Sequence, residues 1–162
     1  MDSPDEKRHA NDLSLQGNRE FGMRVFVRER SQMSERAAGT MSREDKGPVV
    51  PPPTLDGALG TIAEAVADWP GVIATAHWDL FHPPLIDGVD FYFEEEELGH
   101  VHLDGSVHLA TSRALCNALV AEGLARPWPY HRGWVHAQVQ SIGPNAVIAL
   151  FRRNYERLLQ AH

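Results

Sequence analysis

The sequence lacks the features that mark several large classes of protein. Cys116 is its only cysteine, so no intramolecular disulfide can form, and its place among apolar helix residues indicates a packed, unreactive thiol. No apolar run approaches the roughly 20 residues that a membrane-spanning helix needs. The N-terminal residues lack the apolar core of a secretory signal, so the default expectation is a cytoplasmic protein that does not enter a membrane.

The signatures of the common cofactor and catalytic sites are also missing. The chain has no glycine-rich dinucleotide or phosphate loop, no HExxH helix, no GxSxG nucleophile turn and no CxxC pair. The usual nucleotide, phosphate, zinc-protease and hydrolase functions therefore have no support, and we expect no cofactor.

Positive charge is scarce in the C-terminal two-thirds of the chain. Residues 1–54 hold equal numbers of basic and acidic residues, so residues 55–162 carry the whole formal net charge of −7. An acidic folded part is repelled by phosphate backbones and anionic lipids, which counts against nucleic acid and membranes as partners. Arg152, Arg153 and Arg157 form the one basic cluster of that part, and a solvated helix face is its favoured interpretation.

The chain divides into a polar and an apolar part. Residues 1–53 are predicted to be a disordered tail, or an extension that precedes a true start at Met33 or Met41, and they end in a Pro-rich linker. A short strand at residues 21–28 is the one ordered element expected there. Residues 54–162 are predicted to form a single α+β domain.

Hydrophobic periodicity predicts the elements of this domain. Helices are expected at residues 55–68, from Ser112 to Gly123, and from Pro144 onward. Alternation predicts strands at residues 72–78, 89–93, 98–103, 107–110 and 134–140, with loops at 81–88 and 125–133. Hairpin connections imply a mainly antiparallel sheet of four to five strands, with three helices on one face and the other face available to solvent or a partner.

Histidine is abundant, and two histidines share one strand. His100 and His102 lie two residues apart, so both rings point to the same face of the sheet. That spacing suits either a metal site or a pair of acid–base groups, and a carboxylate from residues 94–97 lies near enough to join them. The favoured interpretation is a set of ordinary sheet histidines bonded to carboxylates or water, without a metal.

The position of His108 depends on the hairpin register. Asp104 and Gly105 favour a two-residue turn, which places His108 on the face opposite His100 and His102. A three-residue loop would instead set His102 opposite His108, with all three rings on one face.

A candidate binding surface follows from a second strand. Trp134 and His136 alternate with apolar residues on the strand at residues 134–140, so they share its polar face. An aromatic residue on a polar face suggests a binding surface. We therefore expect His100, His102, Trp134 and His136 to contact the ligand.

Several separated motifs resemble a known family. The segment Gly99-His100-Val101-His102-Leu103-Asp104-Gly105, the run from Leu119 to Ala125 and Gly133-Trp134-Val135 look like the luciferase-domain family of small bacterial and fungal domains. Trp69-Pro70-Gly71-Val72 and the run from Arg152 to Arg157 fit the same family, so the resemblance covers about residues 58–159. Residues 108–112 depart from the family pattern, which leaves His108 without its support as a ligand. The family label does not imply light emission, and its members are described as domains of unknown function.

A weaker likeness is to the MmcQ/YjbR group, which shares the order of an antiparallel sheet, a helix, a loop ending in Trp-Val and a terminal helix. That group is described as having a DNA-binding-like fold, and the acidic balance of this chain argues against that role.

Three functions remain, in order. The first is a binding or interaction module for a small molecule or protein, with His100 and His102 exposed and no convergent carboxylate. The second is an enzyme that uses these histidines, metallated or not, in a cleft with a carboxylate within about 4 Å. The third is a nucleic-acid binder that uses the arginine cluster.

Overall fold

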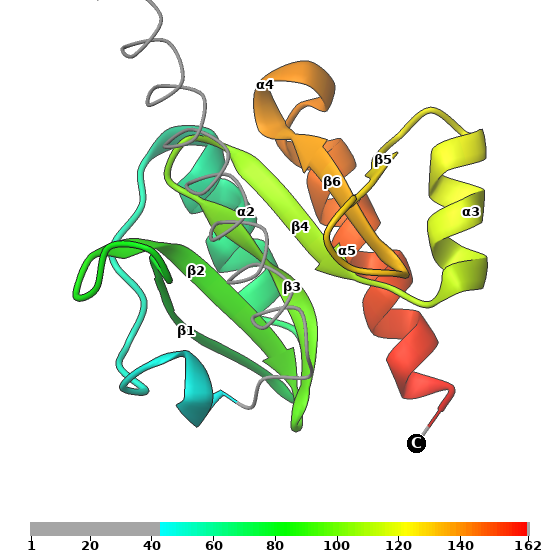
Figure 1. Ribbon diagram of the computed structural model, residues 1–162. Coiled ribbons are helices and arrows are strands. Elements are labelled where there is room, and N and C mark those ends of the chain that lie inside the picture. Colours follow the sequence, from blue (N-terminus) through cyan, green and yellow to red (C-terminus); the bar gives the residue numbers. More distant parts are fainter. Residues whose placement is uncertain (1–42, 162) are drawn as a thin grey trace, which may run out of the picture. The chain divides into compact units, whose positions relative to one another are not determined.

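The computed structural model describes residues 43–161, which form an antiparallel sheet with helices packed against it (Figure 1). The strands are β1 (Val72–Trp78), β2 (Ile86–Phe93), β3 (Glu96–His102), β4 (Ser106–Ala110), β5 (Arg126–Pro127) and β6 (Trp134–Gln138). The helices are the 3-10 turn η1 (Glu44–Lys46), α2 (Gly57–Ala67), α3 (Arg113–Ala121), α4 (Val139–Ile142) and α5 (Pro144–Leu159). Within residues 43–161, every helix is too short or too polar to span a bilayer. The strand expected at residues 21–28 and the alternative start residues lie outside the described residues.

The sheet has the strand order β1-β2-β3-β4-β6-β5, and each neighbouring pair is antiparallel. The α+β class and the antiparallel sheet are therefore confirmed, with six strands where four or five were predicted. The added strand is β5, which pairs with β6 inside the segment predicted as a loop. The strand predicted to reach residue 140 stops at Gln138, because the backbone N–H of Val139 donates to Gly105 O and the chain turns into α4.

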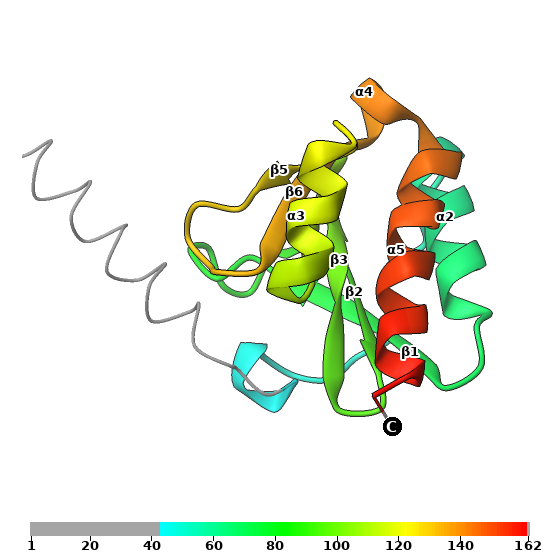
Figure 2. The same ribbon diagram turned by 90° about the vertical axis from the view of Figure 1, so that its right-hand side faces the viewer.

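The apolar residues of the strands face α2 and α5, which lie side by side along one face of the sheet (Figure 2). Phe91 at the centre of β2 packs edge-to-face on Phe151 of α5, with ring centroids 5.2 Å apart. Asn154, the buried polar residue of α5, donates from Nδ2 to Leu98 O and Ala110 O at 2.8 and 3.2 Å. These bonds tie α5 to the ends of β3 and β4, so the helix layer fixes the strands that carry the polar face.

The β3–β4 hairpin corrects the predicted register. Val101 pairs with Val107, and His100 pairs with His108, so the loop has three residues and the predicted two-residue turn was wrong. The alternative pairing of His102 with His108 is not observed either, although the three rings do share a face. Gly105 lies in the left-handed region with φ 84°, as the last position of such a loop requires. Side chains from beyond the hairpin favour this loop, because Gln138 and Gln140 both donate to Asp104 O. His108 therefore points to the same face as His100 and His102.

Residues 43–50 belong to the same compact unit as the sheet. The backbone N–H of Ala76 donates to Val50 O at 3.0 Å along the free edge of β1. Trp78 Nε1 donates to Pro48 O at 2.9 Å, so the Pro-rich segment lies against the end of the same strand. These contacts cover a strand edge that would otherwise be open to pairing with another chain.

Candidate functional site

The face of the sheet opposite the helices carries a row of ionisable side chains. Directly paired positions place Asp90 on β2, His100 on β3, His108 on β4 and His136 on β6 beside one another. Paired residues point to the same face, so this row follows from the register alone. It is buried along most of its length, with exposed fractions of 1% for Asp90, 8% for His100 and 7% for His108.

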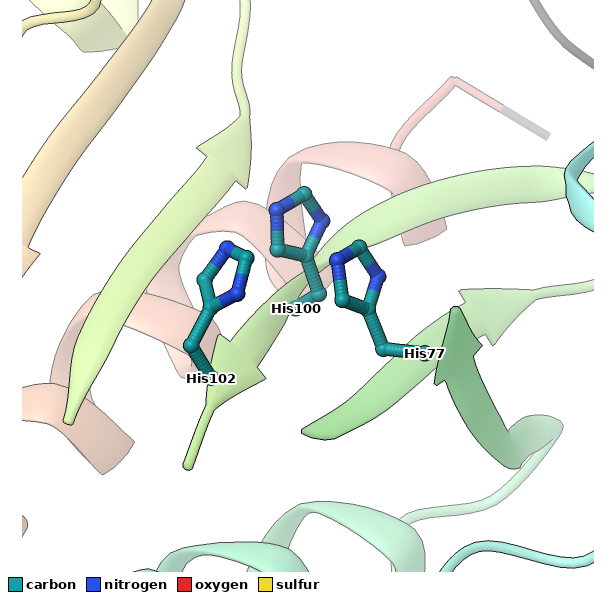
Figure 3. A group of neighbouring side chains, drawn as sticks. All are labelled: His77, His100 and His102. Atoms are coloured by element: carbon teal, nitrogen blue, oxygen red, sulfur yellow. The ribbon is translucent and has the colours of Figure 1, made fainter. Parts of the chain in front are cut away.

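His77 and His102 form a second row beside the first. Both pair with Gly88 of β2, which lies between them and carries no side chain. The space left by Gly88 allows the ring centroids of His77 and His102 to approach to 4.7 Å, while the ring of His77 stacks on that of His100 at 4.2 Å (Figure 3). A Cβ atom on Gly88 would lie 1.9 Å from Val101 O, so no other residue fits between these strands as they stand.

Three of these histidines are held in the same way, each by a carboxylate at its Nδ1 atom. The pairs are His77 with Asp90 at 2.8 Å, His100 with Glu97 at 2.9 Å and His102 with Asp87 at 2.6 Å. An ionised carboxylate only accepts hydrogen bonds, so each Nδ1 carries the proton and donates. In a neutral imidazole the Nε2 atom then carries no proton, and its lone pair is available to a hydrogen-bond donor or a metal ion. This carboxylate–histidine arrangement is typical of histidines that bind metal ions.

The free nitrogen atoms converge on a further histidine. Nε2 of His100 lies 3.0 Å from Nδ1 of His108, and Nε2 of His102 lies 3.3 Å from the same atom. One N–H on His108 can serve only one of these two lone pairs well, and Nε2 of His108 is itself buried without a hydrogen-bond partner in the described part of the chain. The cluster therefore contains more buried lone pairs than protons, which is the condition that a bound cation relieves.

The spacing of the nitrogen atoms suits a metal ion. One ring nitrogen each from His77, His100 and His102 lies within 4.8 Å of the other two. Metal–nitrogen bonds of about 2.0–2.1 Å in a tetrahedral site place ligand nitrogens roughly 3.3 Å apart, close to the separations around His108 Nδ1.

A second group of possible ligands already has a cation beside it. Asp90, Glu97 and His100 also offer atoms within 4.8 Å of one another. Lys46 Nζ lies 2.7 Å from Glu97 Oε2 and 3.4 Å from Asp90 Oδ1, with only 10% of its side chain exposed. Although burial lowers the pKa of Lys46, the two carboxylates raise it overall, so the ammonium stays charged. Lys46 thus neutralises the carboxylates and leaves the histidine nitrogens as the metal-binding part.

His100, His102 and His108 are neutral near pH 7. Burial lowers the pKa of His100 well below its usual range, and the nearby rings of His77 and His108 add to the effect. Burial also lowers the pKa of His102, and it lowers that of His108 to about 3. Metal ions bind the unprotonated imidazole, so no proton must be displaced from an imidazolium before an ion can enter.

The metal-free protein is expected to lose stability as the pH falls from 7 to 5. In the unfolded chain these histidines have pKa values near 6.5 and take up protons in that range, while the folded chain keeps them neutral. The unfolded state then binds more protons, so the free energy of unfolding decreases as the pH falls. Urea unfolding in the presence of a chelator measures this slope, and His108→Asn should make it shallower. A free energy of unfolding that is constant across this range in the wild type would contradict the prediction.

The predicted site residues lie on one face, although not as an exposed surface. His100 and His102 are at the centre, Trp134 lies 5.8 Å from the ring of His100, and His136 lies 5.1 Å from the ring of His108. His77 was missed because strand alternation does not say which strand pairs with which. Asp87 and Asp90 were missed for the same reason, while a carboxylate from residues 94–97 was anticipated and is Glu97.

The geometry contradicts the criterion set for a binding module, because His100 and His102 are largely buried and each has a carboxylate at its Nδ1 atom. His100 is buried with a carboxylate at 2.9 Å, as the enzyme hypothesis requires. Two surface hollows are described within residues 43–161, and no cluster histidine lines either of them. One lies between α3 and α5, and the other lies around Pro48 and Trp78 and is lined by Lys46. The cleft that an enzyme would need is therefore not among them.

The arginine cluster is engaged within the protein. The guanidinium of Arg152 lies over the ring of Trp69 at 3.9 Å, and Arg153 makes two hydrogen bonds to Glu122. Arg157 Nε donates to Asn154 Oδ1 at 2.8 Å. These side chains are half-buried and make contacts within the protein, so the cluster differs from the freely solvated helix face expected from the sequence.

Comparison with known proteins adds one finding. No curated protein and no solved structure matches the chain. The weaker likeness to the MmcQ/YjbR group stays a prediction. In a comparison with protein families, residues 95–149 match the Luciferase domain, a segment that includes His100, His102, His108 and His136 but not His77. The resemblance to the luciferase-domain family is therefore confirmed over residues 95–149, the segment that contributes β3, β4, β5 and β6 to the sheet.

Proposed function

We propose that this domain is a binding module whose ligand is a divalent transition-metal ion, held by His100, His102 and His108 with His77 beside them. One observation carries the proposal: Nε2 of His100 and Nε2 of His102 converge within 3.3 Å of His108 Nδ1, while carboxylates hold the Nδ1 atoms of both rings. Carboxylates at Nδ1 fix the tautomer and ring orientation that metal binding needs.

The donor set favours particular ions. Imidazole nitrogen suits zinc, copper, nickel and iron, whereas magnesium and calcium prefer oxygen ligands. The carboxylates that provide oxygen near the cluster already pair with histidine or with Lys46. We therefore expect the centre to bind Zn²⁺ or Co²⁺ and to reject Mg²⁺.

A metal-dependent reaction is the second candidate function. The contact between Glu97 and His100 favours it, because a buried carboxylate beside a histidine provides an acid–base pair next to the ion. Neither of the two hollows described within residues 43–161 opens onto the rings, which favours binding of an ion over turnover of a substrate, so the binding module comes first.

The test is a metal titration of the full-length protein. We expect Co²⁺ to give an intense visible spectrum typical of tetrahedral nitrogen ligands, to saturate at one ion per chain, and to be displaced by Zn²⁺. His82→Ala is the matched control, because His82 is an exposed histidine outside the cluster, with 67% of its side chain accessible. A wild-type protein that folds but shows no saturable Co²⁺ spectrum would refute the proposal.

A further inference from the structure

Two buried ring nitrogens remain unexplained by the cluster as it stands. Nε2 of His108 and Nδ1 of His136 are both buried and have no hydrogen-bond partner among the described residues. His108 and His136 are directly paired across β4 and β6, and they point to the same face. Two adjacent unpartnered polar atoms cost free energy in any folded state, so a state that pairs them is expected.

The spacing of the two rings is that of a hydrogen-bonded pair. The centroids of His108 and His136 are 5.1 Å apart. The rings of His100 and His108, which do share a hydrogen bond of 3.0 Å, have centroids 5.0 Å apart. His108 and His136 thus lie at the right distance and lack only the right orientation or the right proton.

The proton on His108 also opposes a bond to His136 in the metal-free protein. In the metal-free protein Nδ1 of His108 faces two lone pairs, on His100 and His102, so Nδ1 carries the proton and Nε2 does not. Nε2 of His108 then has no proton to donate to His136. When a metal ion takes the lone pairs of His100 and His102, Nδ1 of His108 faces the ion instead.

We propose that His136 is a positioning residue of the metal centre, which accepts a hydrogen bond from Nε2–H of His108 when Nδ1 of His108 binds the ion. This inference rests on the metal-binding function proposed above. In the step, one proton leaves Nδ1 of His108 and one is taken up at Nε2, so the ring stays neutral, and the Nδ1 lone pair forms the bond to the ion. Both unpartnered nitrogens are satisfied in the loaded state and in that state alone.

Trp128 supports this arrangement. Its ring lies 3.9 Å from that of His108 and 5.7 Å from that of His136, so one aromatic side chain covers both histidines. The tilts between Trp128 and the two rings are similar, 37° and 32°. Trp128 thus contacts both rings, which are tilted by 44° to each other, and limits how far each can turn.

The test combines zinc affinity with the proton position on His108 in the full-length protein. His136→Leu removes the acceptor, and His136→Asn keeps an oxygen acceptor near the position of Nδ1. Loss of the hydrogen-bond partner of a ligating histidine costs about 10–100-fold in metal affinity. We expect that loss in the Leu variant, an affinity near wild type in the Asn variant, and one ion per chain in both. Nitrogen-15 NMR of the imidazoles should show the His108 proton on Nδ1 without zinc and on Nε2 with zinc.

The possible results separate this inference from the proposed function. A wild-type protein that binds no zinc would remove the metal centre and this inference together. Zinc binding that His136→Leu leaves within about 2-fold of wild type would overturn this inference alone, as would a zinc-loaded wild type whose His108 keeps its proton on Nδ1. If the Leu variant fails to fold, the position of the His108 proton in the zinc-loaded wild type still tests the role of His136.

Discussion

A His100→Ala/His102→Ala variant is expected to lose zinc affinity by more than about 1,000-fold. Removing a residue that only supports a ligand costs about 10–100-fold, and this variant removes two ligands at once. His77 and His108 alone would leave at most two histidine ligands, Nε2 of His77, whose Nδ1 is held by Asp90 at 2.8 Å, and Nδ1 of His108. Competition with a coloured chelator measures the affinity, and mass spectrometry of the purified protein measures the metal content.

The control for this variant also replaces two histidines. His82 and His131 lie in loops, and neither belongs to the cluster. His82→Ala/His131→Ala should keep its metal content and its zinc affinity within about 2-fold of wild type, since it leaves every ligand in place. Equal losses in the two double variants would mean that zinc binds surface histidines without a defined centre, and the metal-binding proposal would fall.

Much of the fold follows from local pattern in the sequence. The alternation of Val89, Phe91 and Phe93 places one face of β2 against the helices, and the structure buries all three residues. Ser112 accepts a hydrogen bond from Leu115 N at the start of α3, and Gly123 takes a left-handed φ of 72° just after its end. Signals of this kind depend on a few neighbouring residues, and so they can be predicted without knowledge of the rest of the chain.

The hairpin register shows where local signals fail. Asp104-Gly105 favours a two-residue turn in isolation, yet Asp104 O also accepts hydrogen bonds from Gln138 and Gln140, which are more than thirty residues away. Those bonds are made to the three-residue loop that the fold contains. Because a change of one residue in register moves a side chain to the other face, this distant contact decides whether His108 belongs to the cluster.

The remaining members of the site depend on strand order. His77 lies in the first strand and reaches His100 and His102 across Gly88, an arrangement that requires β2 to lie between β1 and β3. No spacing along the chain contains that information, whereas the His100 and His102 pair is visible as soon as a strand is predicted. His100 and His102 were therefore found as a pair, and His136 was found from the alternation of its own strand, whereas His77 was not found.

Lys46→Met is expected to destabilise the metal-free protein by about 3–5 kcal/mol, the usual effect of breaking a buried ion pair from one side. Lys46 approaches two carboxylates whose side chains are 2% and 11% exposed, Asp90 and Glu97, and both would be left without their ammonium. Denaturant unfolding of the full-length chain with a chelator present measures the change in the free energy of unfolding. Replacing Glu97 as well, with Gln, should recover part of the loss, because one uncompensated charge is removed.

Arg43→Gln is the matched control for Lys46→Met, because Arg43 lies three residues earlier in the same segment. Arg43 pairs with Glu95, whose side chain is 84% exposed, and solvent weakens such a pair to about 0–1 kcal/mol. A small loss in both variants would mean that water reaches Asp90 and Glu97 and that their charges need no partner. A large loss in the lysine variant alone would show that the buried carboxylates which orient His77 and His100 depend on a cation from residues 43–50, outside the sheet. Residues 43–50 would then be part of the histidine centre, because Asp90 and Glu97 could hold the two rings only while Lys46 balances their charge.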